Sequence, residues 1–348
     1  MNLHDVKLRL QAHLSDGLVT VVGSGLSCAE GLPGMGELAT HLLATVGGGL
    51  SGEDADAWTA ASALMSTKGL EAALHEAPPP PAVEVAISNA TGQLIAERER
   101  AVVSEVFGGA RKLRLTRLLK HLVKAPAGMT VVTTNYDRLV EIAVEEAGIG
   151  ADTMFWGRFA GQLSERESRL SFCRNVTIKG RPPVATFHYL QRVLVCKPHG
   201  SLDWYLRDGR PVFYAGDLPD VSRLIITPGK NKFRNGYESP FDHHRARANE
   251  AIDRASRFLV LGYGFNDDHL ETHLSPGIRG GKPTLMLTRS LSTAARRLAE
   301  NNPNVLAVEH GEIGGVAGSK VIVEKSEFFF PGSEMWDVGS FVSEVLEP

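Results

Sequence analysis

This 348-residue chain contains six short apolar runs separated by segments of helical pattern. Each run is continuous rather than alternating, which is typical of strands buried on both faces of a parallel sheet. The runs are "LVTVV" (18–22), "MTVVTT" (129–134), "RVLVC" (192–196), "RLIIT" (223–227), "RFLVLGY" (257–263) and "PTLMLT" (283–288). Amphipathic segments at 112–124, 136–148 and 244–257 are expected to be helices between them. The alternation predicts an α/β fold with a Rossmann-like, doubly wound, mainly parallel sheet and helical insertions.

Two regions interrupt this alternation. Residues 47–110 contain a glycine-rich start, the tract "APPPPAV" and a long polar helical run, and we expect a helical insertion. The four prolines at 78–81 are expected to form a stiff extended spacer within it. Residues 150–191 indicate a second, smaller insertion. The chain is therefore divided into one α/β domain, formed by 1–46 and 111–348, and the insertion 47–110.

The charge balance argues against a dominant nucleic-acid or anionic-membrane surface. The formal net charge is −3 and the isoelectric point is near 6.5. Lys230, Lys232 and Arg234, and the stretch "HHRARA" at 243–248, are interpreted as solvated faces, so direct nucleic-acid binding is not expected.

Cysteine usage and hydropathy indicate the compartment. Cys28, Cys173 and Cys196 are widely spaced and form no C-x-x-C pair, so a four-thiolate zinc site and a disulfide framework are both disfavoured. The N-terminus lacks a signal-peptide apolar region, and no stretch approaches 18 continuous apolar residues. A cytoplasmic protein without a membrane span is expected.

The first run is followed by "GSGLSCAEGLPGM" at 23–35. Gly23 and Gly25 permit a tight turn near a phosphate, and the next helix could present its N–H groups to the same anion. The full dinucleotide fingerprint is absent, because Cys28 stands where its third glycine belongs. A purely structural turn remains an alternative.

Polar residues also follow the second run, in "TTNYD" at 133–137. Thr134, Asn135 and Asp137 suit fixed hydrogen bonds to a sugar or an ordered water. Asp137 could instead cap the next helix, a task for which Asn135 is not needed.

Two further runs end in glycine-containing polar segments. "KPHGS" at 197–201 places His199 where a general base could act, although a surface or packed histidine fits equally. "LGYGFNDDHL" at 261–270 offers Gly262 and Gly264 for close ligand approach and Asn266, Asp267 and Asp268 for capping or ribose contacts. Ligands bind beyond the carboxyl ends of parallel strands, so these segments should meet.

In this order the segments resemble the sirtuin family, specifically its bacterial sirtuin-like NAD-hydrolase branch. The likeness covers about 18–290 and rests on "GSGLS…GLP", "TTNYD", "HGS" and "LGYGFNDDHL". It implies NAD as substrate, with Asn135 orienting a water or holding the nicotinamide ribose and His199 as general base. The resemblance also implies cofactor contacts from Gly23, Ser24, Gly25, Ser27, Pro33, Thr134, Asp137, Gly262, Gly264, Phe265 and Asn266.

Departures from the deacylating sirtuins favour water as the acceptor. Their four-cysteine zinc module is absent, since no cysteine follows Cys196, so neither zinc nor another metal is expected. Thr134 stands where deacylases usually have glutamine. The resemblance thus predicts an NAD+ glycohydrolase that releases nicotinamide and ADP-ribose in antiphage abortive infection. It also implies gating, through homo-oligomer assembly or a DNA-translocating HerA-type ATPase partner.

Alternatives from other classes remain. A protein deacylase or ADP-ribosyltransferase would need a channel for its protein substrate, and a non-catalytic NAD or ADP-ribose module would not need both Asn135 and His199. A serine hydrolase using Ser27, His199 and Asp137 is disfavoured because the G-x-S-x-G elbow is missing. Cys173, Cys196 and His199 lack the close ligand pair of a zinc site.

Overall fold

A mostly parallel sheet forms the centre of the computed structural model, which describes residues 1–123, 128–219, 221–227 and 238–347. Lys230, Lys232 and Arg234 lie outside the described residues. The strands of this sheet are β1 (Leu18–Val22), β2 (Met129–Thr133), β3 (Gly150–Asp152), β8 (Arg192–Cys196), β12 (Arg257–Leu261), β13 (Thr284–Thr288), β14 (Val305–Ile313), β15 (Val316–Val323) and β16 (Ser326–Pro331).

The strand order identifies where a ligand site belongs. Within the described residues the order is β16-β15-β14-β13-β12-β1-β2-β8-β3, and only β15 and β16 run antiparallel to their neighbours. The chain builds outward from β1 through β2 and later returns to place β12 on the other side of β1. The switch point of this doubly wound sheet therefore lies between β1 and β12, and the predicted Rossmann-like α/β fold is confirmed.

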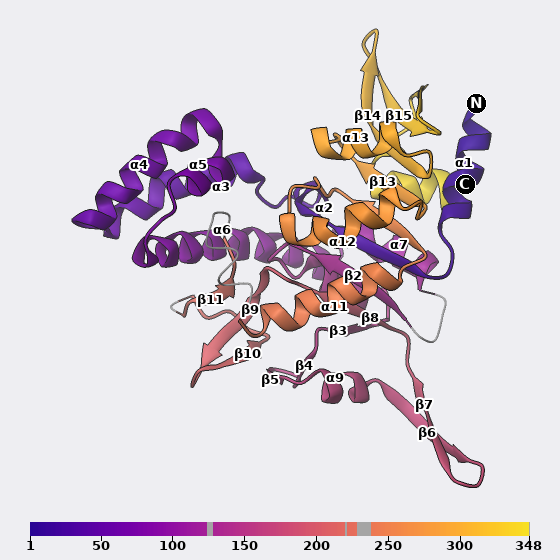
Figure 1. The fold of residues 1–348 in the computed structure, drawn as a ribbon, viewed down its shortest axis with the longest axis horizontal. Coiled ribbons are helices and arrows are strands. Elements are labelled where there is room, and N and C mark those ends of the chain that lie inside the picture. Colours follow the sequence, from indigo (N-terminus) through magenta and orange to yellow (C-terminus); the bar gives the residue numbers. More distant parts are fainter. Residues whose placement is uncertain (124–127, 220, 228–237, 348) are drawn as a thin grey trace.

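Helices cover both faces of the sheet (Figure 1). One face packs mainly against α1 (Leu3–His13), α7 (Arg114–Leu122), α8 (Leu139–Glu146), the helical turn α14 (Val338–Phe341) and the π-helix η2 (Val342–Leu346). The other packs against α11 (Phe241–Arg254), α12 (Asp268–Arg279) and α13 (Thr293–Asn301). Neighbouring residues of β1 point to opposite cores, Val21 to the second and Val22 to the first. This two-sided burial is the reason for the continuous apolar runs.

Residues 47–110 are almost entirely helical. After α2 (Ser24–Ala29) and α3 (Met35–Thr45) come the 3₁₀ turn η1 (Val46–Gly49), α4 (Glu53–Lys68), α5 (Leu70–Glu76) and α6 (Pro81–Phe107). Helices α3 to α6 share a separate apolar core that includes Leu42, Trp58, Leu74 and Ile87. Pro81 opens α6, so the proline tract ends as a helix start rather than continuing as a spacer.

The prediction for 223–227 was wrong in one respect. This run forms β11 (Arg223–Ile225), which lies in a separate small sheet and pairs antiparallel with β9. The other strands of that sheet are β4 (Phe155–Trp156), β5 (Ala160–Leu163), β9 (Gly200–Arg207) and β10 (Arg210–Tyr214). Buried side chains of the small sheet and its flanking residues, among them Phe155, Trp204 and Ile226, form a core of their own. A strand of either sheet can therefore be apolar, and the apolar pattern of 223–227 does not reveal which sheet the run joins.

Residues 150–191 divide among three structures. Strand β3 joins the main sheet, β4 and β5 join the small sheet, and α9 (Glu165–Ser171) leads into the hairpin β6 (Cys173–Lys179) and β7 (Val184–Tyr189). The hairpin extends away from the rest of the molecule (Figure 1). No helix in the described part of the chain is long and apolar enough to cross a bilayer.

Candidate functional site

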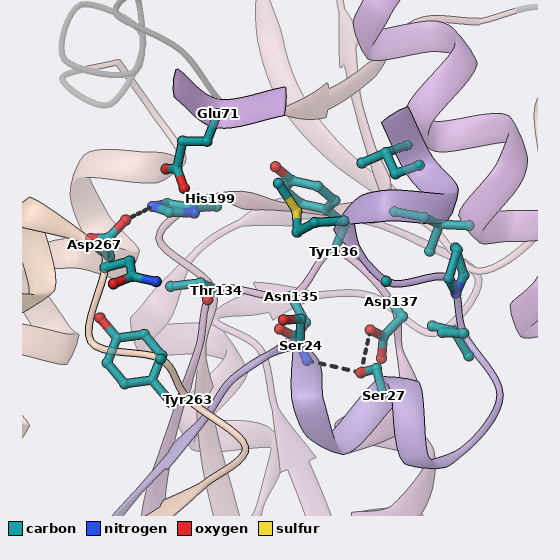
Figure 2. A pocket seen from close by; sticks show the side chains of 18 of the residues that line it. Ser24, Ser27, Glu71, Thr134, Asn135, Tyr136, Asp137, His199, Tyr263 and Asp267 are labelled. Carbon is teal, nitrogen blue, oxygen red and sulfur yellow. Dashed lines mark hydrogen bonds and ion pairs between the residues drawn. The ribbon is translucent and has the colours of Figure 1, made fainter. Parts of the chain in front are cut away.

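A cavity of about 240 Å³ opens at the switch point, beyond the carboxyl ends of the central strands (Figure 2). Its walls come from segments that follow β1, β2, β8 and β12, together with residues of the helical insertion. The lining residues are Ser24, Ser27, Leu32, Pro33, Gly34, Met35, Leu38, Glu71, Ile95, Thr134, Asn135, Tyr136, Asp137, His199, Ile226, Tyr263, Gly264, Asn266 and Asp267. The four polar segments singled out in the sequence therefore meet in one place.

Glycines allow the turn after β1 to touch the end of β12. A Cβ at Gly23 would lie 2.5 Å from the Gly262 carbonyl oxygen, and one at Gly262 would lie 2.5 Å from the Leu26 nitrogen. Gly262 also has a φ of 56°, which favours glycine. The N–H groups of Gly23 and Gly25 donate to Leu261 and Gly262. The Gly23 and Gly25 N–H groups are therefore already hydrogen-bonded within the protein. The glycines let the turn after β1 pack against the end of β12, beneath the cavity.

The Asn135 side chain is held in one orientation. Its Nδ2 donates to the Gly23 carbonyl at 3.0 Å and to the Ser27 hydroxyl at 2.8 Å. Because a carbonyl can only accept, the amide cannot be flipped without losing the Gly23 bond. Both N–H groups are consequently committed to the protein, and Oδ1 is left as the acceptor that Asn135 brings to the cavity. Asn135 is 8% exposed.

Ser27 links Asn135 to Asp137. Its hydroxyl accepts from Asn135 and donates to Asp137 Oδ2 at 2.7 Å (Figure 2). Asp137 Oδ1 in turn accepts from the Leu139 N–H at 3.1 Å, at the start of α8. Asp137 thus satisfies a free backbone N–H at the start of α8 with one carboxylate oxygen and also lines the cavity, and its contact with a sugar or water stays a prediction. The Ser27 hydroxyl therefore uses both of these hydrogen bonds to hold the Asn135 and Asp137 side chains in place.

His199 is positioned by the backbone around it. Gly200 has a φ of 92°, and a Cβ there would lie 2.1 Å from the Leu224 carbonyl oxygen, so only glycine fits. The His199 carbonyl accepts from the Ile226 N–H at 2.9 Å, which ties the histidine to the small sheet. The His199 side chain is 11% exposed and lines the cavity, so it is neither a surface residue nor a core residue.

Asp267 is the partner of His199. Its Oδ2 lies 2.9 Å from His199 Nε2, while its Oδ1 accepts from the Leu270 N–H and caps α12. The helix N-terminus and the cap hold the carboxylate in place beside the imidazole ring. A histidine oriented by a fixed carboxylate is an arrangement suited to proton transfer. Sequence reasoning named Asp267 only for capping or ribose contacts and missed this pairing.

A buried lysine, Lys197, links the segment after β8 to the segment after β2. The Lys197 side chain is 1% exposed, and its ammonium group pairs with Glu141 at 2.9 Å and donates to the Asp137 carbonyl. Burial raises the pKa of the Glu141 carboxyl, and the nearby Lys197 charge opposes that rise. Lys197 thereby joins the segment bearing His199 to the segment bearing Asn135 and Asp137.

The helical insertion forms one wall of the cavity. Glu71 of α5 lies beside His199 in Figure 2, and Ile95 of α6 lines the same space. Glu99 of α6 is fully buried and pairs with Arg138, just after the Asn135 segment, at 2.6 Å. Burial raises the pKa of Glu99, and Arg138 opposes that rise. The insertion is thus anchored to the site, although nothing in the sequence pattern around Glu71 indicated it.

Two tyrosines complete the lining. The Tyr136 hydroxyl donates to the Ile226 carbonyl at 2.5 Å, and Tyr263 donates to Glu271 at 3.2 Å. Burial raises the pKa of both hydroxyls, and neighbouring carboxylates, including Asp267, raise each further. Both therefore stay protonated near neutral pH and serve as hydrogen-bond donors.

Most predicted site residues meet at the cavity, and four do not line it. Ser24, Ser27, Pro33, Thr134, Asn135, Asp137, His199, Gly264 and Asn266 do. Gly23, Gly25 and Gly262 shape the turn beneath it, and Phe265 packs in the core with 5% exposure. Contact with a cofactor stays a prediction for all of these residues, whether or not they line the cavity.

Metal ligands were not expected, and the described residues contain no group of three or more His, Cys, Asp or Glu side chains suited to an ion. A serine hydrolase using Ser27, His199 and Asp137 would need Ser27 bonded to His199 and His199 bonded to Asp137. Instead, Ser27 donates to Asp137 and His199 pairs with Asp267, so that chain is not formed among these groups.

The SIR2-like domain family model matches residues 129–307, slightly more than half of the chain. The chain belongs to the SIR2-like domain family. The match spans the Asn135, His199 and Asp267 segments, and the glycine turn at 23–35 and the insertion lie before it. The resemblance to sirtuins is thereby confirmed at the level of the family.

Solved sirtuin structures are similar to this chain at low identity. One, titled as the structural basis for the mechanism and regulation of Sir2 enzymes, is 13% identical with a TM-score of 0.37, covering 84% of this chain and 89% of that chain. A Sir2 variant with a deacetylated p53 peptide and 3′-O-acetyl ADP-ribose is 13% identical with a TM-score of 0.41, covering 100% and 98%. A Sir2 complex with p53 peptide and NAD+ is 14% identical with a TM-score of 0.38, covering 100% and 98%. No curated protein matches significantly.

Proposed function

We propose that this protein is an NAD+ glycohydrolase that cleaves NAD+ to nicotinamide and ADP-ribose. Membership of the SIR2-like family is the reason for considering NAD+. The observation that carries the proposal is the cavity at the switch point, where the Asn135 amide oxygen and the His199–Asp267 pair lie beyond the carboxyl ends of β2, β8 and β12.

The reaction requires little acid catalysis. Breaking the bond between the ribose C1′ and the nicotinamide nitrogen returns the electron pair to the ring, which leaves as a neutral base. Positive charge develops on the ribose, as in other glycoside cleavages. Water then adds at C1′ and releases one proton, which balances the reaction. A fixed acceptor and a base are therefore the groups the protein must supply.

Asn135 and His199 match these two tasks. Because both Asn135 N–H groups are tied to Gly23 and Ser27, its Oδ1 is available to accept from a ribose hydroxyl or from the attacking water. His199 would take the released proton, with the Asp267 carboxylate lying 2.9 Å from its Nε2 atom. Ser24, Thr134, Gly264 and Asn266 line the remaining wall and would position the rest of the dinucleotide.

We further propose that the activity is gated and serves antiphage abortive infection in the cytoplasm. An enzyme that consumes NAD+ freely would harm its own host. The insertion is suited to a gate because Glu71 lies beside His199 while Glu99 and Arg138 anchor the helix that follows. The resemblance stated above is what suggests homo-oligomer assembly, or a HerA-type ATPase partner, as the trigger.

The test is chromatography of NAD+ incubated with the purified full chain. Asn135→Ala and His199→Ala should each lower turnover by about 100-fold or more, as loss of a positioned acceptor or base does. Asp267→Asn should cause a smaller loss. His4→Ala on α1 and Asn301→Ala on α13, both exposed and remote, are the matched controls.

The products decide between functions. Nicotinamide and ADP-ribose formed without any peptide support hydrolysis, whereas products that require an acylated peptide would support deacylation. Binding of NAD+ by calorimetry without cleavage, both alone and with the HerA-type ATPase, would support a binding module. Full turnover in both the Asn135 and His199 variants would refute the site.

A further inference from the structure

The hairpin β6–β7 has no neighbour in its sheet among the described residues. Its strands pair only with each other, and it projects past α9 away from the rest of the molecule (Figure 1). An isolated two-stranded ribbon is at best marginally stable in water. A ribbon that is nonetheless extended from the domain suggests a partner that it reaches.

The two faces of the hairpin differ in chemistry. Val176 pairs with Phe187 and Ile178 with Ala185 on one face, and Ile178 is 69% exposed. The opposite face carries the cross-strand pairs Asn175–His188 and Thr177–Thr186. The ribbon therefore offers apolar side chains on one side and hydrogen-bonding groups on the other.

Positive charge is concentrated on this arm. Residues 173–189 contain Arg174, Lys179 and Arg181 and no Asp or Glu. All three cations are exposed, and none forms an ion pair with another described residue. The longer segment 158–192 holds seven lysines and arginines against two glutamates, in a chain whose net charge is −3. The overall charge balance therefore hides a local basic surface.

Two arginines lie against an aromatic side chain at the base of the arm, and one of them, Arg192, is 15% exposed and ion-paired with Asp152. The guanidinium groups of Arg169 and Arg192 lie 5.2 Å and 5.8 Å from the centre of the Tyr189 ring. Tyr189 in turn stacks with Phe187 at 6.4 Å. Such stacking fixes aromatic and cationic groups together at the point where the ribbon leaves the domain.

We propose that β6–β7 is a nucleic-acid-binding arm whose ligand is duplex DNA. A two-stranded ribbon fits the major groove, and unpaired Arg and Lys side chains suit the flanking phosphates. Charge complementarity favours a polyanion over an apolar protein surface, because 173–189 holds three exposed cations and no Asp or Glu, and a duplex offers a phosphate to each cation. This binding site is independent of the proposed NAD+ hydrolysis, and it revises the expectation from net charge for this segment alone.

The test is fluorescence anisotropy of a labelled 20-base-pair duplex titrated with the full chain at several salt concentrations. The variant reverses the arm charges with Arg174→Glu, Lys179→Glu and Arg181→Glu. The matched control makes the same charge change on exposed, unpaired cations elsewhere, with Lys120→Glu, Arg297→Glu and Lys325→Glu. Thermal melting of both variants shows whether each remains folded.

The expected result is salt-dependent binding by the wild type, with a log–log slope of about −2.7 for three phosphate contacts. The arm variant should bind at least about tenfold more weakly with a slope near zero, and the control should bind within about twofold of wild type. Equal binding by the arm variant and the wild type overturns the proposal, as does absence of wild-type binding at low salt.

Two other outcomes also overturn it. Binding to single-stranded DNA alone would exclude groove recognition. A change of association state in Val176→Ser and Phe187→Ser, seen by sedimentation, together with unaltered DNA binding by the charge variant, would identify the arm as a protein interface.

Discussion

Replacing Ser27 with alanine would break the hydrogen-bond chain that orients Asn135. In the folded protein the Ser27 hydroxyl accepts from Asn135 at 2.8 Å and donates to Asp137 at 2.7 Å, and Ser27 is 7% exposed. The substitution removes one oxygen atom without adding bulk. It leaves one Asn135 N–H and one Asp137 oxygen without their protein partner.

The size of the effect follows from these two groups. A buried polar group that loses its partner costs about 1–3 kcal/mol. Water in the adjoining cavity can replace part of each bond, so we expect a total loss of about 2 kcal/mol in the free energy of unfolding. For a chain of 348 residues the unfolding entropy is about 0.7 kcal/mol per degree, so the melting temperature should fall by about 3 °C.

Activity should fall as well, because Asn135 would keep only its bond to Gly23 and could rotate. We expect turnover of NAD+ to drop by about tenfold, since a misplaced catalytic group loses much of its positioning advantage. Urea denaturation and the chromatographic assay measure the two effects separately.

Two comparisons give this prediction its control. Ser24→Ala removes a hydroxyl from the same cavity that makes no side-chain hydrogen bond to a described residue, so its stability should stay within about 0.5 kcal/mol of wild type. In a double-mutant cycle, Ser27→Ala and Asn135→Ala should be non-additive. Equal stability of the two serine variants, or full additivity in the cycle, would refute the proposed chain.

Two further predictions concern the backbone at the site and the core under α1. Gly200→Ala should lower the free energy of unfolding by more than ~3 kcal/mol in urea denaturation, of which ~1–2 kcal/mol comes from the positive φ and the rest from the clash with the Leu224 carbonyl. Gly209→Ala is the control, because Gly209 has a φ of 71° and open space around it, and it should lower the free energy of unfolding by only about 1 kcal/mol. Equal losses in the two variants would rule out the clash. His13 is buried and hydrogen-bonded to the Phe258 carbonyl, and burial lowers its pKa from 6.5 to about 4. Since the unfolded chain binds a proton between these values and the folded chain does not, stability should fall by about 3 kcal/mol as pH drops from 6.5 to 4, and His13→Gln should remove that part of the fall.

Much of the sheet could be predicted from local pattern. The runs at 18–22 and 192–196 coincide with β1 and β8, because strands covered on both faces need continuous apolar side chains. The run at 223–227 has the same composition and joins a different sheet, since Arg223 and Ile225 pair with β9. The apolar composition of a run predicts that its side chains are buried. Which strand the run pairs with depends instead on how the connecting segments arrange the strands in space.

The extension of the sheet by β14, β15 and β16 was also not predicted. These strands lie after residue 300, in a stretch that was assigned to the α/β domain without any predicted strand. Their pairing is between neighbours in the chain, but β14 joins the parallel sheet through β13, and that contact is a tertiary one.

At the site, the sequence by itself determined that Asn135 and His199 would lie near each other, because each follows a buried strand and the carboxyl ends of parallel strands lie at one edge of the sheet. Only the tertiary structure decided how they are held. Asp267 reaches His199 because the end of β12 lies across the switch point. Glu71 of α5 reaches the same space because α5 shares a core with α6, and α6 is held to the site by the Glu99–Arg138 pair. A local pattern encodes burial and backbone geometry, whereas contacts between residues far apart in the chain arise only when the elements pack.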